Sequence, residues 1–310
     1  MVAKLRFGMA MGGRMERGNG ADSDAMEYSL RYNPPVDIRL AEQYLIDVKG
    51  IFDEIGVTFV LSSGSCLGAV RDNALIPWDD DIDLVSIIGE HGLTTESIYA
   101  ALDVFRDRGY YVRHNPNWSA LSHSFMKDYV RIDWSCLHQF EGNVYSYPGV
   151  SVPARFYIYP TEIEFLGRQF LVPGDPKEYL RLKYGSEWMI PKRPGQYEKD
   201  VIENVEKLQT TTDVCKIRVL GVDGSPVQNA IITLAGGSDC VTNEAGEAQV
   251  MLGGTSWYAL MIRYQGHEQA LYMEELEPDA TYVYRVDAVS RQELSASGDI
   301  GTLGNVLIRE

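Results

Sequence analysis

Four carboxylates fall within five positions of this chain, and this run constrains its possible folds more than any other feature. They belong to Asp79, Asp80, Asp81 and Asp83. Like charges at this spacing repel one another and destabilise a fold unless a cation or solvent screens them. The run leads into the apolar segment 82–87, which predicts a buried strand and argues against a solvated acidic loop. An EF-hand loop is also disfavoured, because its glycine and closing glutamate are missing. The sequence therefore predicts a cation site at the edge of a core.

The alternation of side chains along a strand assigns these carboxylates to two faces. Asp79, Asp81 and Asp83 share one face, and Asp80 lies on the other. Two carboxylates beside a core offer the hard oxygen ligands that suit Mg²⁺, with Mn²⁺ as the alternative. We predict that Asp81 and Asp83 hold the metal, and the roles of Asp79 and Asp80 stay open.

A further strand carries one aspartate between two apolar residues. Asp133 lies between Ile132 and Trp134. A third carboxylate would complete the ligands of a two-metal site and help to deprotonate an acceptor hydroxyl. The predicted catalytic and metal-binding residues are therefore Asp81, Asp83 and Asp133, although an isolated strand aspartate can also be an ordinary polar residue.

The segment before the acidic run has the features of a phosphate site. Gly64 and Ser65 follow a predicted strand and open a predicted helix, so backbone N–H groups and the helix dipole would point at an anion. Arg71 is suited to clamp phosphate because it is planar and always charged, with a surface role as its alternative. Trp78 lies between the two motifs. We predict substrate or phosphate binding at Gly64, Ser65, Arg71 and Trp78.

The rest of the chain divides into four parts. Residues 1–35, rich in Gly, Met and charge, are expected to be flexible. Residues 36–210 alternate helices and strands, which indicates an α/β domain. Helices are predicted at 37–55, 66–71, 94–107, 175–184 and 198–209, and strands at 57–61, 82–87, 110–112 and 129–134. Short strand-like runs separated by turns then predict an antiparallel β-sandwich at 213–289, followed by a loose tail at 290–310.

The overall composition limits partners and compartment. The net charge of −16 would repel a nucleic-acid backbone, whereas a small anionic donor could still bind beside a metal.

The four cysteines form no CxxC pair, which favours reduced thiols, with a Cys215–Cys240 bridge as the alternative. There is no apolar run of about 18 residues, and Arg14 interrupts the only leader-like segment. We therefore expect a cytoplasmic protein without a transmembrane segment.

Two motifs together resemble the signature of the LicD/fukutin family of phosphocholine and related phospho-substituent transferases. They are SGSCLGAVR at 63–71 and IPWDDDID at 76–83, and segments 164–173 and 179–188 are similar to the family's C-terminal block. The resemblance covers about residues 38–193. It implies a nucleotidyltransferase fold, a CDP-linked donor and a glycan hydroxyl as acceptor. It also implies that the Gly64–Ser65 pair holds phosphate and that Asp81, Asp83 and Asp133 hold metal.

The expected function is the transfer of phosphocholine or a polyol phosphate to a cell-surface polysaccharide, such as a capsule or lipopolysaccharide. A nucleotidylyltransferase acting on a small molecule or protein, or a non-catalytic glycan-binding protein, is the alternative. The predicted β-sandwich resembles carboxypeptidase-regulatory and transthyretin-like modules. Its aromatic residues would form either a sugar-stacking platform or part of the core, at Trp257, Tyr258, Tyr264 and Tyr272. Since no proposed ligand lies beyond residue 193, we expect this module to be dispensable for chemistry.

Overall fold

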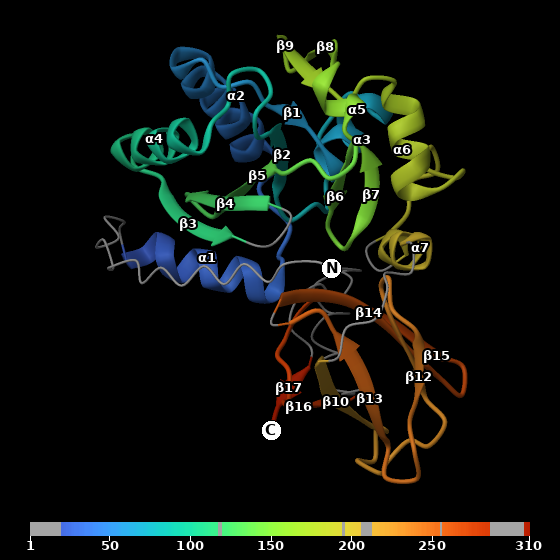
Figure 1. The fold of residues 1–310 in the computed structure, drawn as a ribbon. Coiled ribbons are helices and arrows are strands. Elements are labelled where there is room, and N and C mark those ends of the chain that lie inside the picture. Colours follow the sequence, from blue (N-terminus) through green and yellow to red (C-terminus); the bar gives the residue numbers. More distant parts are fainter. Residues whose placement is uncertain (1–19, 117–119, 194–195, 206–212, 255, 286–306) are drawn as a thin grey trace, which may run out of the picture.

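The computed structural model describes residues 20–116, 120–193, 196–205, 213–254, 256–285 and 307–310. Figure 1 shows a mixed helical and stranded unit, with a β-rich unit formed by the C-terminal part of the chain beneath it. The first strand of the β-rich unit, β10, begins at Asp213.

The first unit is built on a five-stranded sheet with the order β1-β2-β5-β4-β3. Its strands are Val60–Leu61, Ile82–Ile87, Val130–Leu137, Ala120–Lys127 and Tyr111–Pro116, in that order across the sheet. The central pair, β2 and β5, runs parallel, and the other neighbours are antiparallel. The predicted strands at 82–87 and 129–134 are confirmed, and they form the centre of the sheet.

Helices α2 (Ile38–Ile55) and α4 (Thr95–Asp107) lie together over one face of this sheet (Figure 1). Asp37 caps the start of α2 by accepting hydrogen bonds from the amides of Arg39 and Leu40. Gly56 ends the helix with a φ of 70°, a conformation that glycine adopts without strain. The helix predicted at 37–55 is confirmed, and the buried face of α2 packs into the main core.

Helix α1 (Gly20–Tyr32) differs from the expectation that residues 1–35 are flexible. Ala25, Met26 and Leu30 are buried against Tyr111 of β3 and Met126 of β4. Figure 1 shows α1 on the opposite side of these strands from α2 and α4. The average composition of residues 1–35 concealed the short apolar stripe that drives this packing. Residues 1–19 lie outside the described part of the chain.

The remaining elements of the first unit lie around the β1 edge of the sheet. Helix α3 (Ser63–Arg71) packs against β2. Two hairpins and three short helices follow: β6 (Asn143–Ser146) with β7 (Val150–Pro153), α5 (Arg155–Ile158), β8 (Thr161–Phe165) with β9 (Arg168–Val172), α6 (Pro176–Tyr184) and α7 (Tyr197–Asn204). The predicted helix at 175–184 is confirmed, with Asp175 as its N-cap.

The β-rich unit consists of two four-stranded sheets around a separate apolar core. One sheet contains β13 (Glu247–Leu252), β10 (Asp213–Leu220), β16 (Thr281–Arg285) and β17 (Ile308–Arg309). The other contains β12 (Asp239–Val241), β11 (Ile231–Leu234), β14 (Ser256–Tyr264) and β15 (His267–Leu276).

Two details of this unit correct the sequence analysis. Strands β10 and β16 pair in parallel, so the unit is not purely antiparallel. Part of the expected tail forms β17, which pairs with β16, whereas residues 290–306 lie outside the described part. The likeness to a transthyretin-like module stays a prediction.

All four cysteines are free thiols, and the alternative Cys215–Cys240 bridge is not formed. Among the helices in the described ranges, none is long and apolar enough to cross a bilayer.

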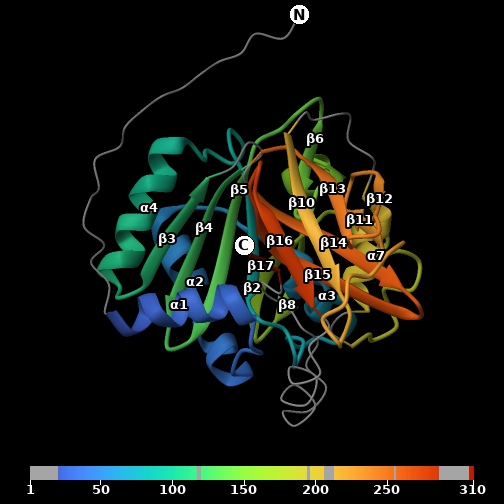
Figure 2. The same ribbon diagram turned by 90° about the horizontal axis from the view of Figure 1, so that it is seen from below.

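The two units meet at a small apolar cluster. Ile202 of α7 is buried against Ala259 and Met261 of β14. Two ion pairs flank this contact, Lys199–Glu268 and Arg263–Glu203, each at 2.5 Å. Figure 2, viewed from below, shows α7 beside β14 and β15. This contact places β14 and β15 opposite the acidic edge of the first sheet.

Candidate functional site

The acidic residues of the two central strands lie side by side. In the parallel pairing of β2 with β5, Asp83 is directly opposite Asp133. Residues paired in this way point to the same face of a sheet. Both side chains line a cavity of about 940 Å³, at the upper end of the ~300–1,000 Å³ typical of ligand sites. The predicted association of Asp83 with Asp133 therefore has a structural basis.

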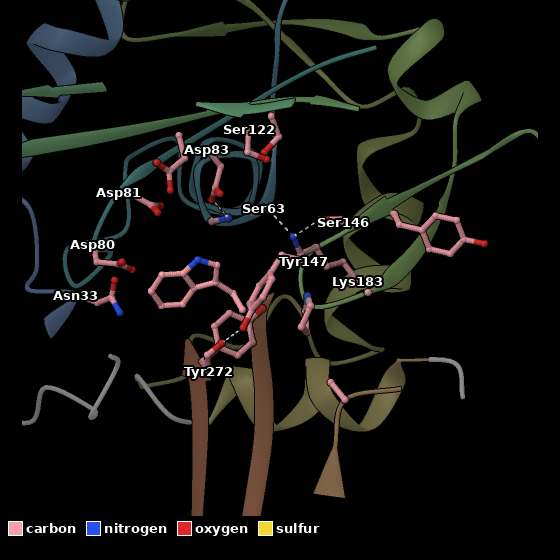
Figure 3. Close-up of a pocket in the computed structure, with 18 of the residues that line it drawn as sticks. Asn33, Ser63, Asp80, Asp81, Asp83, Ser122, Ser146, Tyr147, Lys183 and Tyr272 are labelled. Atoms are coloured by element: carbon pink, nitrogen blue, oxygen red, sulfur yellow. Dashed lines mark hydrogen bonds between the residues drawn. The ribbon is translucent and has the colours of Figure 1, made fainter. Parts of the chain in front are cut away.

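The other three aspartates lie in the loop before β2. One carboxylate oxygen from each of Asp79, Asp80 and Asp81 lies within 4.8 Å of the others. The strand begins only at Ile82, so alternation does not extend back to these positions. The predicted separation of Asp80 from Asp81 is therefore wrong. Figure 3 shows Asp80, Asp81 and Asp83 along the same side of the cavity.

A buried arginine explains how the protein tolerates this charge. Arg131 is only 2% exposed, and its guanidinium forms ion pairs with Asp81 at 2.7 Å, with Asp133 at 3.4 Å and, more closely, with Asp80. It also donates hydrogen bonds to Ser29 Oγ at 3.2 Å and Asn33 Oδ1 at 2.9 Å, at the end of α1. Helix α1 thus contributes to the acidic site.

The sequence analysis missed Arg131, although a signal was present. Arg131 and Asp133 are two positions apart on β5, so alternation places them on one face. A buried strand arginine beside a buried aspartate is rarely left unpaired, because the desolvation of an isolated charge is costly.

The predicted phosphate pair, Gly64 and Ser65, contacts Asp83 in this structure, and its phosphate binding stays a prediction. The amide of Gly64 donates to Asp83 Oδ2 at 3.0 Å, and the amide of Asp83 donates to Ser65 Oγ at 2.9 Å. The start of α3 therefore binds the Asp83 carboxylate, which the positive end of the helix dipole favours. A Cβ at Gly64 would lie 2.3 Å from Asp79 Oδ2, so a glycine is needed for Asp79 to approach α3.

The carboxylates are only partly neutralised by these contacts. Burial, followed by repulsion from Asp81, raises the pKa of both Asp79 and Asp83 well above the usual range. Burial also raises the pKa of Asp80 and of Asp133 to about 7, even though Arg131 opposes the shift. Within the described residues, Asp133 Oδ1 is buried without a hydrogen-bond partner. The cluster therefore has a deficit of positive charge that a bound cation could fill.

A buried lysine lies across the cavity from the acidic loop. Lys183, in the last turn of α6, donates hydrogen bonds to Ser146 Oγ at 3.2 Å and, more closely, to Ser63 Oγ. Figure 3 shows these three side chains converging. Within the described ranges Lys183 forms no ion pair at salt-bridge distance, although its charge acts to lower the pKa of the Asp83 carboxyl. The sequence analysis missed Lys183, although it lies within the segment that resembles the family's C-terminal block.

The two remaining predicted residues also line the cavity. Arg71 forms an ion pair with its neighbour Asp72 at 2.7 Å and donates to the carbonyl of Trp188 at 3.5 Å. Trp78 packs against the main core and faces the cavity. Their predicted substrate contacts stay predictions.

The β-rich unit supplies part of the cavity wall, which the sequence analysis did not anticipate. Trp257, Tyr258, Tyr272 and Glu275 line the cavity from β14 and β15. The Tyr147 hydroxyl of the first unit donates a hydrogen bond to the carbonyl of Tyr272 (Figure 3). Tyr264, also considered for sugar stacking, packs instead against the core of the β-rich unit.

An α/β unit with paired acidic strands and a neighbouring basic group can hold a metal ion beside an anionic ligand. Residues 56–175 match the nucleotidyltransferase domain described as LicD/FKTN/FKRP, and this domain belongs to that family. The resemblance noted in the sequence is confirmed. The matched segment contains all five of these aspartates.

Three relatives illustrate the similarity. The human ribitol-5-phosphate transferase FKTN is 29% identical over 159 residues, which cover 47% of this chain and 32% of that protein. The mouse ribitol 5-phosphate transferase FKRP is 27% identical over 202 residues, which cover 60% of this chain and 36% of that protein. The uncharacterized protein RT0683 of Rickettsia typhi is 33% identical over 73 residues, which cover 24% of this chain and 22% of that protein. This chain thus spans about a third of the length of the two named transferases.

Proposed function

We propose that this chain is a metal-dependent transferase that moves a polyol phosphate from a CDP-activated donor to a glycan hydroxyl. Phosphocholine is the second candidate for the transferred group. The observation that carries the proposal is the pairing of Asp83 with Asp133 beside a three-aspartate loop, in a cavity that also contains a buried lysine. The names of the two transferase relatives favour a polyol phosphate. The acceptor would be a cell-surface polysaccharide.

The residues of the cavity suit a divalent cation. Asp81, Asp83 and Asp133 would hold Mg²⁺ or Mn²⁺, and the unpartnered Asp133 Oδ1 among the described residues supports this assignment. A bound Mg²⁺ would neutralise the donor's diphosphate and lower the pKa of the acceptor hydroxyl.

The protein's own residues would position and stabilise the reacting groups. The acceptor oxygen attacks the phosphorus of the transferred group, a new P–O bond forms, and the bond to CMP breaks. The hydroxyl proton passes to a carboxylate of the acidic cluster. Lys183 would bind phosphate oxygens, and its contacts with Ser63 and Ser146 fix its position. Gly64 orients Asp83, while Arg131 orients Asp80 and Asp81.

A thermal-shift screen tests the proposal with CDP-ribitol, CDP-glycerol and CDP-choline in the presence of Mg²⁺. A true donor at about 100 times its dissociation constant adds ~2.7 kcal/mol to the free energy of unfolding. EDTA should abolish this stabilisation, because a diphosphate entering an acidic cavity requires a cation. A shift with none of these donors, or one that persists in EDTA, would contradict the proposal.

Product analysis separates the alternative activities. Transfer of the phospho-group releases CMP, whereas a nucleotidylyltransferase leaves the nucleotide on its target and releases pyrophosphate or a phospho-compound. Phosphorus NMR distinguishes these products directly. A non-catalytic glycan-binding protein would give neither.

A further inference from the structure

The cavity has two chemically different walls. On the side of the first unit it is lined by the aspartates and by the cations Arg71, Arg131, Lys183 and Lys192. The residues described for the β-rich unit contribute aromatic, aliphatic, small and polar side chains to the lining, together with Glu275, and no lysine or arginine. Among the described residues, all counter-charges for the charged part of a nucleotide donor therefore come from the first unit.

The aromatic residues of the second wall lie on the strands that join the two units. Trp257 is half-buried on β14, and Tyr272 is half-buried on β15. The ring of Tyr272 meets that of Tyr147 edge-on, with centroids 5.3 Å apart and an interplanar angle of 87°. Together with the hydrogen bond from Tyr147 to the Tyr272 carbonyl, this contact holds the second wall against the first unit.

The second wall also lies outside the segment shared with the family. The match at 56–175 includes all of the aspartates and ends before β10 begins. The carboxylates proposed to hold the metal therefore lie within the matched segment, and none of them belongs to the second wall. The described part of the second wall contributes aromatic rings and no lysine or arginine, which suits it to the acceptor glycan better than to the donor's diphosphate.

We propose that Trp257 and Tyr272 form the subsite for a neutral sugar of the acceptor glycan. This inference rests on the proposed function and adds the substrate class bound by the second wall. Aromatic rings stack on the apolar faces of sugars, and the neighbouring Ser238, Ser256 and Glu275 are polar enough to bind hydroxyl groups. A nucleobase could stack on the same rings, so the test must separate the two ligands.

The experiment compares the full-length parent protein with Trp257→Ala, Trp257→Phe and a control, Tyr159→Ala. Tyr159 is 74% exposed and does not line the cavity, so the control also removes an aromatic ring. Each protein is labelled and applied to a printed glycan array with CMP and Mg²⁺, and CMP affinity is measured by calorimetry. Thermal unfolding verifies that every variant is folded.

We expect the parent protein to bind a subset of neutral glycans. Trp257→Ala should weaken this binding about tenfold or more, a loss that corresponds to ~1.4 kcal/mol of binding free energy. Trp257→Phe should retain most of it, and the control all of it. The affinity for CMP should stay within about twofold in all four proteins, a difference of under ~0.5 kcal/mol.

Three results would overturn the inference: no glycan binding by the parent, undiminished glycan binding by Trp257→Ala, or an equal loss of CMP affinity in that variant. The last would identify the second wall as a nucleobase site. If glycan binding depends on Trp257 but the parent releases no CMP from any CDP-linked donor, the sugar subsite stands and the proposed transferase activity fails.

Discussion

Asp83 and Asp133 face one another across the parallel strands β2 and β5, although fifty residues of sequence separate them. Each is held by a different partner. Asp83 accepts a hydrogen bond from the Gly64 amide, and Asp133 forms an ion pair with Arg131. The two carboxylates are therefore fixed independently at the same edge of the cavity, as a preorganised metal site requires.

Replacing Asp83 with asparagine should abolish most activity without unfolding the protein. Asparagine retains an oxygen that can accept the Gly64 hydrogen bond, but it removes a charge and a metal ligand. Turnover should fall by about 10³-fold, by analogy with the loss of one preorganised electrostatic group. The release of CMP measures this change. Asp53→Asn is a suitable control, because Asp53 is exposed on α2 and pairs only with Lys49 among the described residues. Turnover of Asp83→Asn within about tenfold of the parent would contradict the site assignment.

Replacing Arg131 with methionine should strongly destabilise the metal-free protein. The change leaves Asp80, Asp81 and Asp133 without their shared cation, and breaking such a buried ion pair costs about 3–5 kcal/mol. Denaturant unfolding measures the loss. Millimolar Mg²⁺ should recover part of it if the same carboxylates bind metal.

The matched control for Arg131 is Arg181→Met. Arg181 is exposed on α6 and pairs with Glu178 at 2.7 Å, and such surface pairs contribute ~0–1 kcal/mol. A similar small loss in Arg131→Met would show that Arg131 does not support the acidic cluster.

The raised carboxyl pKa values predict an unusual dependence of stability on pH. Asp80 and Asp133 have pKa values of about 7 in the folded protein, against 3.8 for an ordinary aspartate. Between these limits the folded state binds more protons than the unfolded state, so their contribution to stability falls as the pH rises from about 4 to about 7. Denaturant unfolding across this range, in EDTA, measures the slope. The Asp133→Asn variant should show a shallower slope of stability against pH. Mg²⁺ should also make the slope shallower, because the bound metal replaces the protons on the carboxylates. An unchanged slope in Asp133→Asn would contradict the assignment.

Replacing Lys183 with methionine should weaken donor binding. A hydrogen bond to a charged group contributes ~1.5–3 kcal/mol, so the dissociation constant of a CDP-linked donor should rise by about 10- to 100-fold. Calorimetry in the presence of Mg²⁺ measures the change. Lys177→Met on the same helix is the control, since Lys177 is exposed. Equal affinities for the two variants would remove Lys183 from the phosphate site.

The predictable part of the site follows from local rules. Alternation and an apolar run located β2, and the same argument located Asp133 on a second strand. The helix predicted at 37–55 matches α2 at Ile38–Ile55. The family motif then related Asp83 to Asp133, and the register of β2 with β5 supports that relation.

The rest depends on contacts between distant segments, which local patterns do not encode. The hydrogen bond from Arg131 to Ser29 spans 102 residues, and it requires α1 to dock beneath β3 and β4. Lys183 reaches Ser63 across 120 residues, and Tyr147 reaches Tyr272 across 125. The alternation rule failed at Asp80 because the strand starts two residues later, where the loop turns to present its carboxylates to Arg131.

The close approach of Asp79 to Gly64 also has an evolutionary consequence. A Cβ at position 64 would lie 2.3 Å from Asp79 Oδ2, so a larger residue there requires the Asp79 carboxylate to move away from α3. A descendant that had lost its acidic loop would be released from this constraint and could accept alanine or serine at position 64. The residue at position 64 in related chains should therefore indicate whether the acidic loop is still under selection.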